Sequence, residues 1–152
     1  MQESFSIINK TKGKLGSLPF VKIKEDILGK KYSLSIAFVD EKTSKEINKK
    51  YRNKNKSTNI LSFLLSKNMG EIILCPVVIK KEVKIKKFNK TYPELLGFLV
   101  IHGMLHLKGF EHSSTMERLE EEYDQKYFCG DRCGIVHDES RGRGIFKRRK
   151  KS

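Results

Sequence analysis

Residues 92–112 read YPELLGFLVIHGMLHLKGFEH, and this segment decides the fold because it predicts a long helix in the core. Residues 92–107 are apolar on nearly every side, which is typical of a fully buried helix. Gly109 is suited to end the helix, since glycine readily adopts the left-handed backbone conformation needed there. The second half of the segment carries three histidines, His102, His106 and His112.

The spacing of these histidines predicts a metal centre. His102 and His106 are four residues apart and project from one helix face, while the turn at Gly109 lets His112 return toward them. Three neutral imidazoles suit Zn²⁺, although nickel, copper or iron also accept them. A site with three protein ligands leaves one position for water, which zinc can ionise near pH 7. We therefore expect one Zn²⁺ per chain and a catalytic metal-bound water.

Two other interpretations of this segment stay open on spacing alone. Histidines on an apolar helix are often core residues that hydrogen-bond backbone carbonyls. The spacing also matches the metzincin proteases, whose motif is H-E-x-x-H-x-x-G-x-x-H. Gly103 stands where those proteases carry the glutamate that accepts a proton, so the sequence disfavours a metalloprotease.

A second set of metal-binding residue types lies further along the chain. Cys129, Cys133 and His137 would share one face of a continuing helix, but Gly130 and Gly134 interrupt it. Because a structural zinc site normally takes four ligands, incidental unpaired cysteines are the favoured interpretation. The three cysteines of the chain are an odd and sparse set, which predicts no disulfide framework and suits a reducing compartment.

The remaining apolar pattern predicts a small sheet. Strands are expected at residues 5–8, 34–38, 60–65 and 71–75, where apolar and β-branched residues cluster. The short connection between the last two strands predicts an antiparallel pair. Since helices are expected between and after these strands, the order of elements indicates an α+β fold.

Helix signals fill the gaps between the strands. Pro19 can open one helix, Asp40 can cap another, and Ser114 with Glu117 matches a capping box. Residues 76–88 suit a helix, although the alternation near their end also suits a strand. The last helix has an apolar stripe of Met116, Leu119, Tyr123 and Tyr127. Its outer face is acidic and is expected to be solvated without a function; the acids are Glu117, Glu120, Glu121, Glu122 and Asp124.

The composition favours an anionic partner. Lysine and arginine number 32 against 18 acidic residues, a formal net charge of +14 over 152 residues. Such a charge attracts polyanions, of which nucleic acid is the commonest in the cytoplasm, while a solvated basic surface is the alternative. The apolar pattern fades after residue 129, and seven cations without an acid lie between Arg141 and Lys151. We expect a domain at residues 1–129 and a flexible basic tail at residues 130–152.

Neither a membrane span nor an export signal is predicted. The longest apolar run, residues 95–101, is far shorter than the roughly 20 residues that a span needs. The first ten residues lack the charged, apolar and small-residue pattern of a signal peptide. A cytoplasmic location without a membrane partner is expected.

Three motifs together resemble the YbeY family, the bacterial rRNA maturation factors that act as metal-dependent endoribonucleases. HGMLHLKGFEH at residues 102–112 is similar to the family signature H-G-x-L-H-L-x-G-[YF]-[DE]-H. Tyr51-Arg52, followed by STNILSF at residues 57–63, and GEIIL at residues 70–74 resemble two further family segments. The three matches fall in family order, and the resemblance covers roughly residues 5–128. Proline is usual in the family where Ser57 and Leu64 stand here.

The resemblance implies a single α+β domain with a small mixed four-stranded sheet, about five helices, and the histidines on and just after a buried central helix. It implies that His102, His106 and His112 hold the metal and that Arg52 is functional near a basic RNA groove. Arginine makes paired hydrogen bonds to phosphate oxygens and stabilises the charge that grows during cleavage. Four lysines flank Arg52 in the sequence and are expected to add phosphate contacts: Lys49, Lys50, Lys54 and Lys56.

The function expected from this resemblance is zinc-dependent cleavage of single-stranded RNA in rRNA maturation and ribosome quality control. The partner is then RNA, specifically rRNA of the small ribosomal subunit, with ribosomal proteins as further partners and the basic tail as an rRNA anchor. A ribosome-associated RNA-binding factor with a structural metal and no catalysis is the alternative. No residue type in the motifs identifies the general base.

Overall fold

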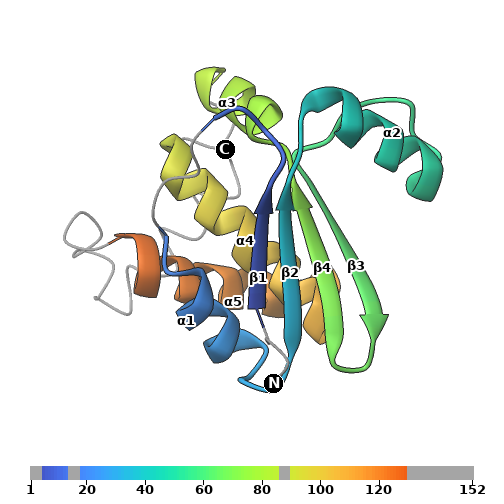
Figure 1. Cartoon of the computed structure of the whole chain (residues 1–152). Coiled ribbons are helices and arrows are strands. Elements are labelled where there is room, and N and C mark those ends of the chain that lie inside the picture. Colours follow the sequence, from blue (N-terminus) through green and yellow to red (C-terminus); the bar gives the residue numbers. More distant parts are fainter. Residues whose placement is uncertain (1–4, 14–17, 86–89, 130–152) are drawn as a thin grey trace.

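A four-stranded mixed sheet forms the centre of the computed structural model, which describes residues 5–13, 18–85 and 90–129. The spatial order is β1 (Phe5–Asn9), β2 (Ser33–Phe38), β4 (Met69–Leu74) and β3 (Ile60–Ser66) (Figure 1). β1, β2 and β4 run parallel, and β3 pairs antiparallel with β4 through a short turn. The antiparallel pair and the mixed sheet expected from the sequence are confirmed.

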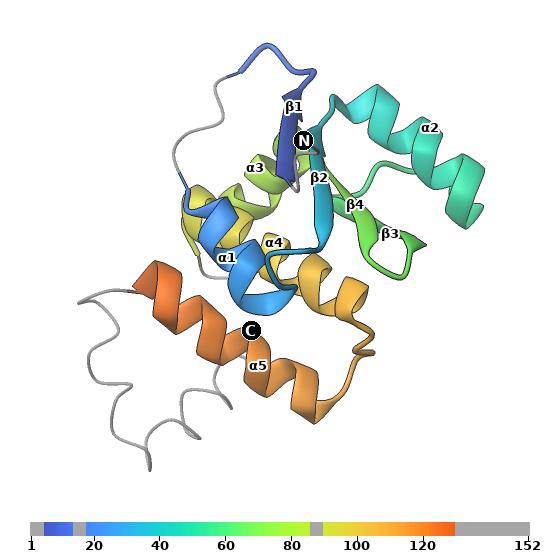
Figure 2. The same cartoon turned by 60° about the horizontal axis from the view of Figure 1, so that its bottom comes forward.

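Five α-helices pack on the two faces of this sheet. α1 (Phe20–Ile27), α3 (Pro76–Lys84), α4 (Tyr92–Lys108) and α5 (Ser114–Asp124) share one face, with a π-helical turn at Gln125–Cys129 after α5. α2 (Glu41–Arg52) packs on the opposite face (Figure 2). The α+β single-domain architecture is therefore as expected.

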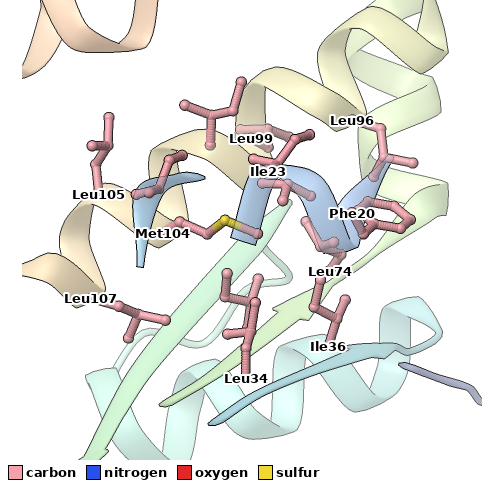
Figure 3. Close-up of a cluster of buried hydrophobic side chains, with 14 of the residues drawn as sticks. Phe20, Ile23, Leu34, Ile36, Leu74, Leu96, Leu99, Met104, Leu105 and Leu107 are labelled. Atoms are coloured by element: carbon pink, nitrogen blue, oxygen red, sulfur yellow. The ribbon is translucent and has the colours of Figure 1, made fainter. Parts of the chain in front are cut away.

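The main core lies between α4 and the sheet. α4 runs behind the strands in Figure 1 and buries apolar residues on nearly all sides, because α1, α3 and α5 cover the flanks that the sheet leaves open. Figure 3 shows side chains of this core. Ile36 and Leu74 of the sheet face Leu96, Leu99 and Met104 of α4 in this cluster. Burial of each such side chain stabilises the fold by about 1.5–3 kcal/mol.

Local signals set the ends of the helices that carry function. Thr91 and Glu94 form a reciprocal capping box at the start of α4. Gly109 ends α4 with a φ of 114°, a left-handed conformation that glycine adopts without strain. Asp40 caps α2 by accepting a hydrogen bond from the Thr43 amide at 2.8 Å, as expected.

The structure corrects one local expectation and defines two further features. Ser113, not Ser114, caps α5, because its side chain accepts from the Met116 amide at 3.2 Å. The helix expected in the 76–88 segment is confirmed as α3, which runs to Lys84. Arg52 is the last residue of α2, and the polar loop follows it.

The acidic face of α5 was expected to be solvated, and for three residues this expectation is wrong. Glu120 and Glu121 are 7% exposed and Asp124 is 1% exposed. Asp124 pairs with Lys90 at 3.1 Å, so the charge is compensated inside the protein. α5 is therefore covered on more of its circumference than its composition indicates.

None of the helices in the described ranges is long and apolar enough to cross a membrane. The expected basic tail at residues 130–152, with Cys133 and His137 of the second candidate metal set, lies outside the described residues.

Candidate metal centre

The three histidines converge at the C-terminal end of α4. His102 and His106 come from the helix, and His112 approaches them from the connection that follows Gly109. Each offers a ring nitrogen, and these atoms all lie within 4.8 Å of one another. The cluster expected from the histidine spacing is therefore present, with His112 contributed by the segment after Gly109.

Hydrogen bonds to Nδ1 decide which nitrogen His102 and His106 present to the cluster. The Phe110 carbonyl accepts from Nδ1 of His106 at 3.0 Å. The Glu120 carboxylate contacts Nδ1 of His102 and accepts its hydrogen. With Nδ1 protonated on both rings, both Nε2 atoms keep a free lone pair, which is the form that binds a metal.

The geometry of these lone pairs fits a metal ion. Nε2 of His102 and Nε2 of His106 lie 3.0 Å apart, and in the neutral form with Nδ1 protonated both rings present a lone pair to the space between them. Two nitrogens bound at 2.0–2.1 Å in a tetrahedral zinc site lie about 3.3 Å apart. A cation between the lone pairs relieves their repulsion. The arrangement of the three histidines therefore fits the binding of a transition metal better than it fits a purely structural role in the core.

Electrostatics favour the neutral ligand at His106. Burial lowers the pKa of His106 from its ordinary value of 6.5, and the neighbouring His102 lowers it further. A neutral imidazole binds a metal without first releasing a proton. The site is thus prepared for a cation at neutral pH.

Glu120 is a functional candidate that the sequence argument missed. It is separated from His102 by 18 residues and was grouped with the solvated acids of α5. The helical spacing could have predicted that Glu120 is buried. Glu120 follows Met116 by four residues and therefore lies beside the apolar stripe of the helix. A carboxylate on that stripe is buried and needs a partner inside the protein.

Arg52 shares a pocket with the histidines. The pocket has a volume of about 430 Å³, and its lining includes Arg52, Ser62 and Gly103 besides the three histidines. Arg52 is exposed at the end of α2, and Asn53 turns the chain away with a φ of 58°. The following loop is held by Asn48, whose amide donates to the Lys56 carbonyl at 2.8 Å. The arginine is thus anchored beside the histidines by an ordered segment.

The four flanking lysines are placed differently. Lys49, Lys50, Lys54 and Lys56 are all exposed, and none of them lines the histidine pocket. Lys50 instead lines a neighbouring cleft on the other side of Leu64. Among the described residues, Arg52 is therefore the lysine or arginine that lines the histidine pocket, and the four lysines lie near Arg52 in the sequence.

Gly103 packs closely against two side chains of the sheet. A Cβ added there would lie 3.0 Å from Ile60 Cδ1 and 3.1 Å from Ile72 Cδ1. A larger residue at this position would require these isoleucine side chains to shift, so the local packing favours glycine over the glutamate of the proteases. The metalloprotease alternative thus lacks structural support.

The fold and the site define a class: a small α+β domain with a cluster of three histidines that could hold a metal ion. The chain belongs to the YbeY family, since the sequence model of "Endoribonuclease YbeY" matches residues 9–128. The family expected from the three motifs is confirmed.

Known proteins agree with this assignment along most of the chain. "Endoribonuclease YbeY" of Buchnera aphidicola is 40% identical over 113 residues, which cover 62% of this chain and 70% of that protein. The Staphylococcus carnosus protein of the same name is 33% identical over 133 residues, 80% of this chain and 84% of that one. A solution structure from Thermotoga maritima matches with a TM-score of 0.60 at 26% identity, covering 88% of this chain and 95% of that chain.

Proposed function

We propose that this protein is a zinc-dependent endoribonuclease that cleaves single-stranded RNA in rRNA maturation and ribosome quality control. The observation that carries the proposal is the shared pocket of Arg52, His102, His106 and His112. It combines a metal-binding donor set with the one side chain suited to hold a phosphodiester in two-point contact. The relatives named endoribonucleases support RNA as the substrate.

Each residue has a distinct role in this proposal. His102, His106 and His112 hold the ion through ring nitrogens, and Glu120 and the Phe110 carbonyl keep two of the rings oriented. When bound, a zinc ion can activate water and polarise a phosphate oxygen. Arg52 binds the phosphate and stabilises the charge that grows on its oxygens.

Two routes of cleavage are open, and they differ in the group that attacks the phosphorus. The pocket lining contains no carboxylate among the described residues, so no conventional general base stands beside the phosphate. Either water attacks the phosphorus directly, or the ribose 2′-OH does so and leaves a 2′,3′-cyclic phosphate. Mass spectrometry of the product ends separates these routes.

The biological setting follows from charge and substrate. A net charge of +14 favours a large RNA partner, and we propose rRNA of the small subunit, with ribosomal proteins as neighbours, in the cytoplasm. A concave pocket accepts a flexible single strand more readily than a stiff duplex. The basic residues 141–151 would add affinity that does not depend on RNA sequence.

The test uses the full-length protein and one RNA in two forms. Elemental analysis is expected to find about one zinc per chain, and the protein to cut the single strand but not the annealed duplex. Removal of metal by a chelator is expected to stop cleavage, and added Zn²⁺ to restore it. RNA binding that persists without any cleavage in the metal-loaded protein would instead support the non-catalytic RNA-binding factor.

A further inference from the structure

A second cleft lies between α2 and the β3–β4 hairpin, on the sheet face opposite α4. It has a volume of about 540 Å³. Figure 2 shows α2 on this face and the long central helix on the other. Ile73 of β4 belongs to a buried cluster at the floor of the cleft, and the partly buried Ile47 of α2 and Phe63 of β3 pack against this cluster. None of the proposed catalytic groups uses this cleft.

The cleft and the histidine pocket meet at the edge strand β3, where Leu64 lines both cavities. Tyr51 and Arg52 are consecutive residues at the end of α2, with Tyr51 lining the cleft and Arg52 lining the pocket. An RNA strand whose phosphate rests on Arg52 can therefore pass over this sheet edge and bring a neighbouring nucleotide to the mouth of the cleft.

The side chains around the mouth are unusually exposed for apolar groups. Tyr51 is 60%, Leu64 is 62% and Leu65 is 57% exposed. The Tyr51 ring lies edge-on to Phe63 with centroids 5.2 Å apart, and the Lys50 ammonium lies 5.3 Å from the Tyr51 centroid. Exposed aromatic rings beside a cation are the usual platform on which single-stranded nucleic acids stack their bases.

Charge inside the cleft selects the part of a nucleotide that can enter. Glu46 and Glu71 line it, and Glu71 pairs directly across the strands with Phe63. Two carboxylates repel a phosphate, but they accept hydrogen bonds from the N–H groups of a base edge. Guanine offers two adjacent donors, N1–H and the N2 amino group, whereas uracil offers one. The cleft is therefore complementary to a nucleobase and not to the phosphate backbone.

We propose that this cleft is a nucleobase subsite that takes an unpaired base of the RNA strand, guanine in preference to uracil, next to the phosphate held at the histidine pocket. The inference rests on the proposed endoribonuclease function and names a specificity element of the same substrate path. Tyr51 supplies the stacking surface, and Glu71 reads the donor edge.

Binding can be measured separately from cleavage. We suggest fluorescence anisotropy of the full-length protein, in the presence of a chelator, with labelled heptauridylate and with the same strand carrying one central guanine. The wild-type protein is expected to bind the guanine-containing strand about tenfold more tightly, the usual size of one good base contact. Glu71→Gln is expected to reduce this preference to twofold or less.

Stacking is tested by truncating the exposed ring. Tyr51→Ala is expected to weaken binding of both strands about tenfold, as loss of one stacked base does. Tyr51→Phe keeps the ring and is expected to bind like the wild type, which separates stacking from loss of fold. Ile85→Ala removes an apolar group that is 71% exposed and distant in sequence at the end of α3, and it is expected to change nothing.

Three outcomes would overturn the subsite. The first is equal affinity of the wild type for both strands, and the second is unchanged RNA binding by Tyr51→Ala. The third is a Tyr51→Ala variant that binds RNA normally but loses a ribosomal protein partner, which would make the cleft a protein-docking surface. A wild type that prefers guanine yet never cleaves RNA when loaded with metal would support the subsite and refute the proposed function.

Discussion

The Glu120 carboxylate of α5 accepts a hydrogen bond from Nδ1 of His102 in α4, and this contact joins two helices at the metal centre. Its consequence is that Nε2 of His102 faces Nε2 of His106 within the three-histidine cluster. Glu120 is only 7% exposed, and burial of a carboxylate is favourable only with such a hydrogen-bond partner. α5 thus supports the metal site without supplying a ligand.

Replacing this carboxylate should weaken metal binding. Glu120→Gln keeps the shape of the side chain but replaces the charged acceptor that orients the His102 ring. We expect a loss of zinc affinity of about tenfold or more, as for other residues that orient a metal-bound histidine. Competition with a chromogenic chelator measures it. The matched control is Glu122→Gln on the exposed side of the same helix, and equal affinities for both variants would contradict the role of Glu120.

Removing a ligand should abolish both metal and cleavage. His102→Ala, His106→Ala and His112→Ala each leave two imidazoles, and we expect each purified variant to hold less than about a tenth of the wild-type zinc. His137→Ala is the control, since that histidine belongs to the second candidate set. Full zinc in the three variants together with loss in His137→Ala would move the metal to the cysteine-rich segment.

Arg52 should act on the phosphate without affecting the metal. Arg52→Ala is expected to lower the rate of RNA cleavage by about 100-fold or more, the typical effect of removing one group that stabilises developing charge. Zinc content should stay at the wild-type level, because Arg52 lines the pocket but is not one of the groups that orient the histidine rings. Arg52→Lys is expected to recover only part of the rate.

Lys54→Ala provides the comparison for charge alone. It removes one exposed cation near the same loop, and we expect a small loss of RNA affinity that disappears at high salt. An Arg52→Ala variant that behaves like Lys54→Ala would reduce Arg52 to a general phosphate contact.

A pH effect should arise where α1 meets the end of the last helix. Lys126 and Tyr127 donate hydrogen bonds to Asp26 at 2.6 and 2.7 Å, and these bonds, the one from Lys126 above all, lower the pKa of Asp26 below its ordinary 3.8. The stabilisation is present above the unfolded pKa and is lost as the pH falls through the lower folded value. Asp26→Asn should cost about 1 kcal/mol of unfolding free energy at pH 7.

Urea unfolding of wild type and Asp26→Asn at several pH values measures this difference. We expect the gap to narrow below about pH 4, as protonation removes the charge from the wild-type carboxyl. The neighbouring exposed Glu25→Gln serves as the control on the same helix. A gap that stays constant down to the acid range would show that the ion pair contributes no pH dependence.

Local patterns predicted most of the elements. The alternation of Leu34, Ile36 and Phe38 marks β2, and Asp40 and Gly109 mark a helix start and a helix end. Such signals act between residues close in sequence, so they can be interpreted without knowing the fold. The Ser113 cap shows their limit, because two adjacent serines offer the same chemistry and only the backbone path selects one.

The acidic residues of α5 show where sequence patterns fail. Composition suggested a solvated face, yet the fold buries Glu120 against His102 and Asp124 against Lys90. Burial of a carboxylate depends on a partner supplied by another element, and nothing within α5 itself specifies that partner. The cleft at Tyr51 was invisible for the same reason, since its walls come from α2, β3 and β4.

The sequence alone determined the three-histidine cluster, the buried helix that carries two of these histidines and the family, because four-residue spacing and glycine geometry operate within one segment. Tertiary structure decided which nitrogen His102 and His106 present, that Arg52 lines the same pocket, and that a second cleft adjoins this pocket. These relationships join residues of different elements, so their distances exist only once α2, α4 and α5 have packed on the sheet.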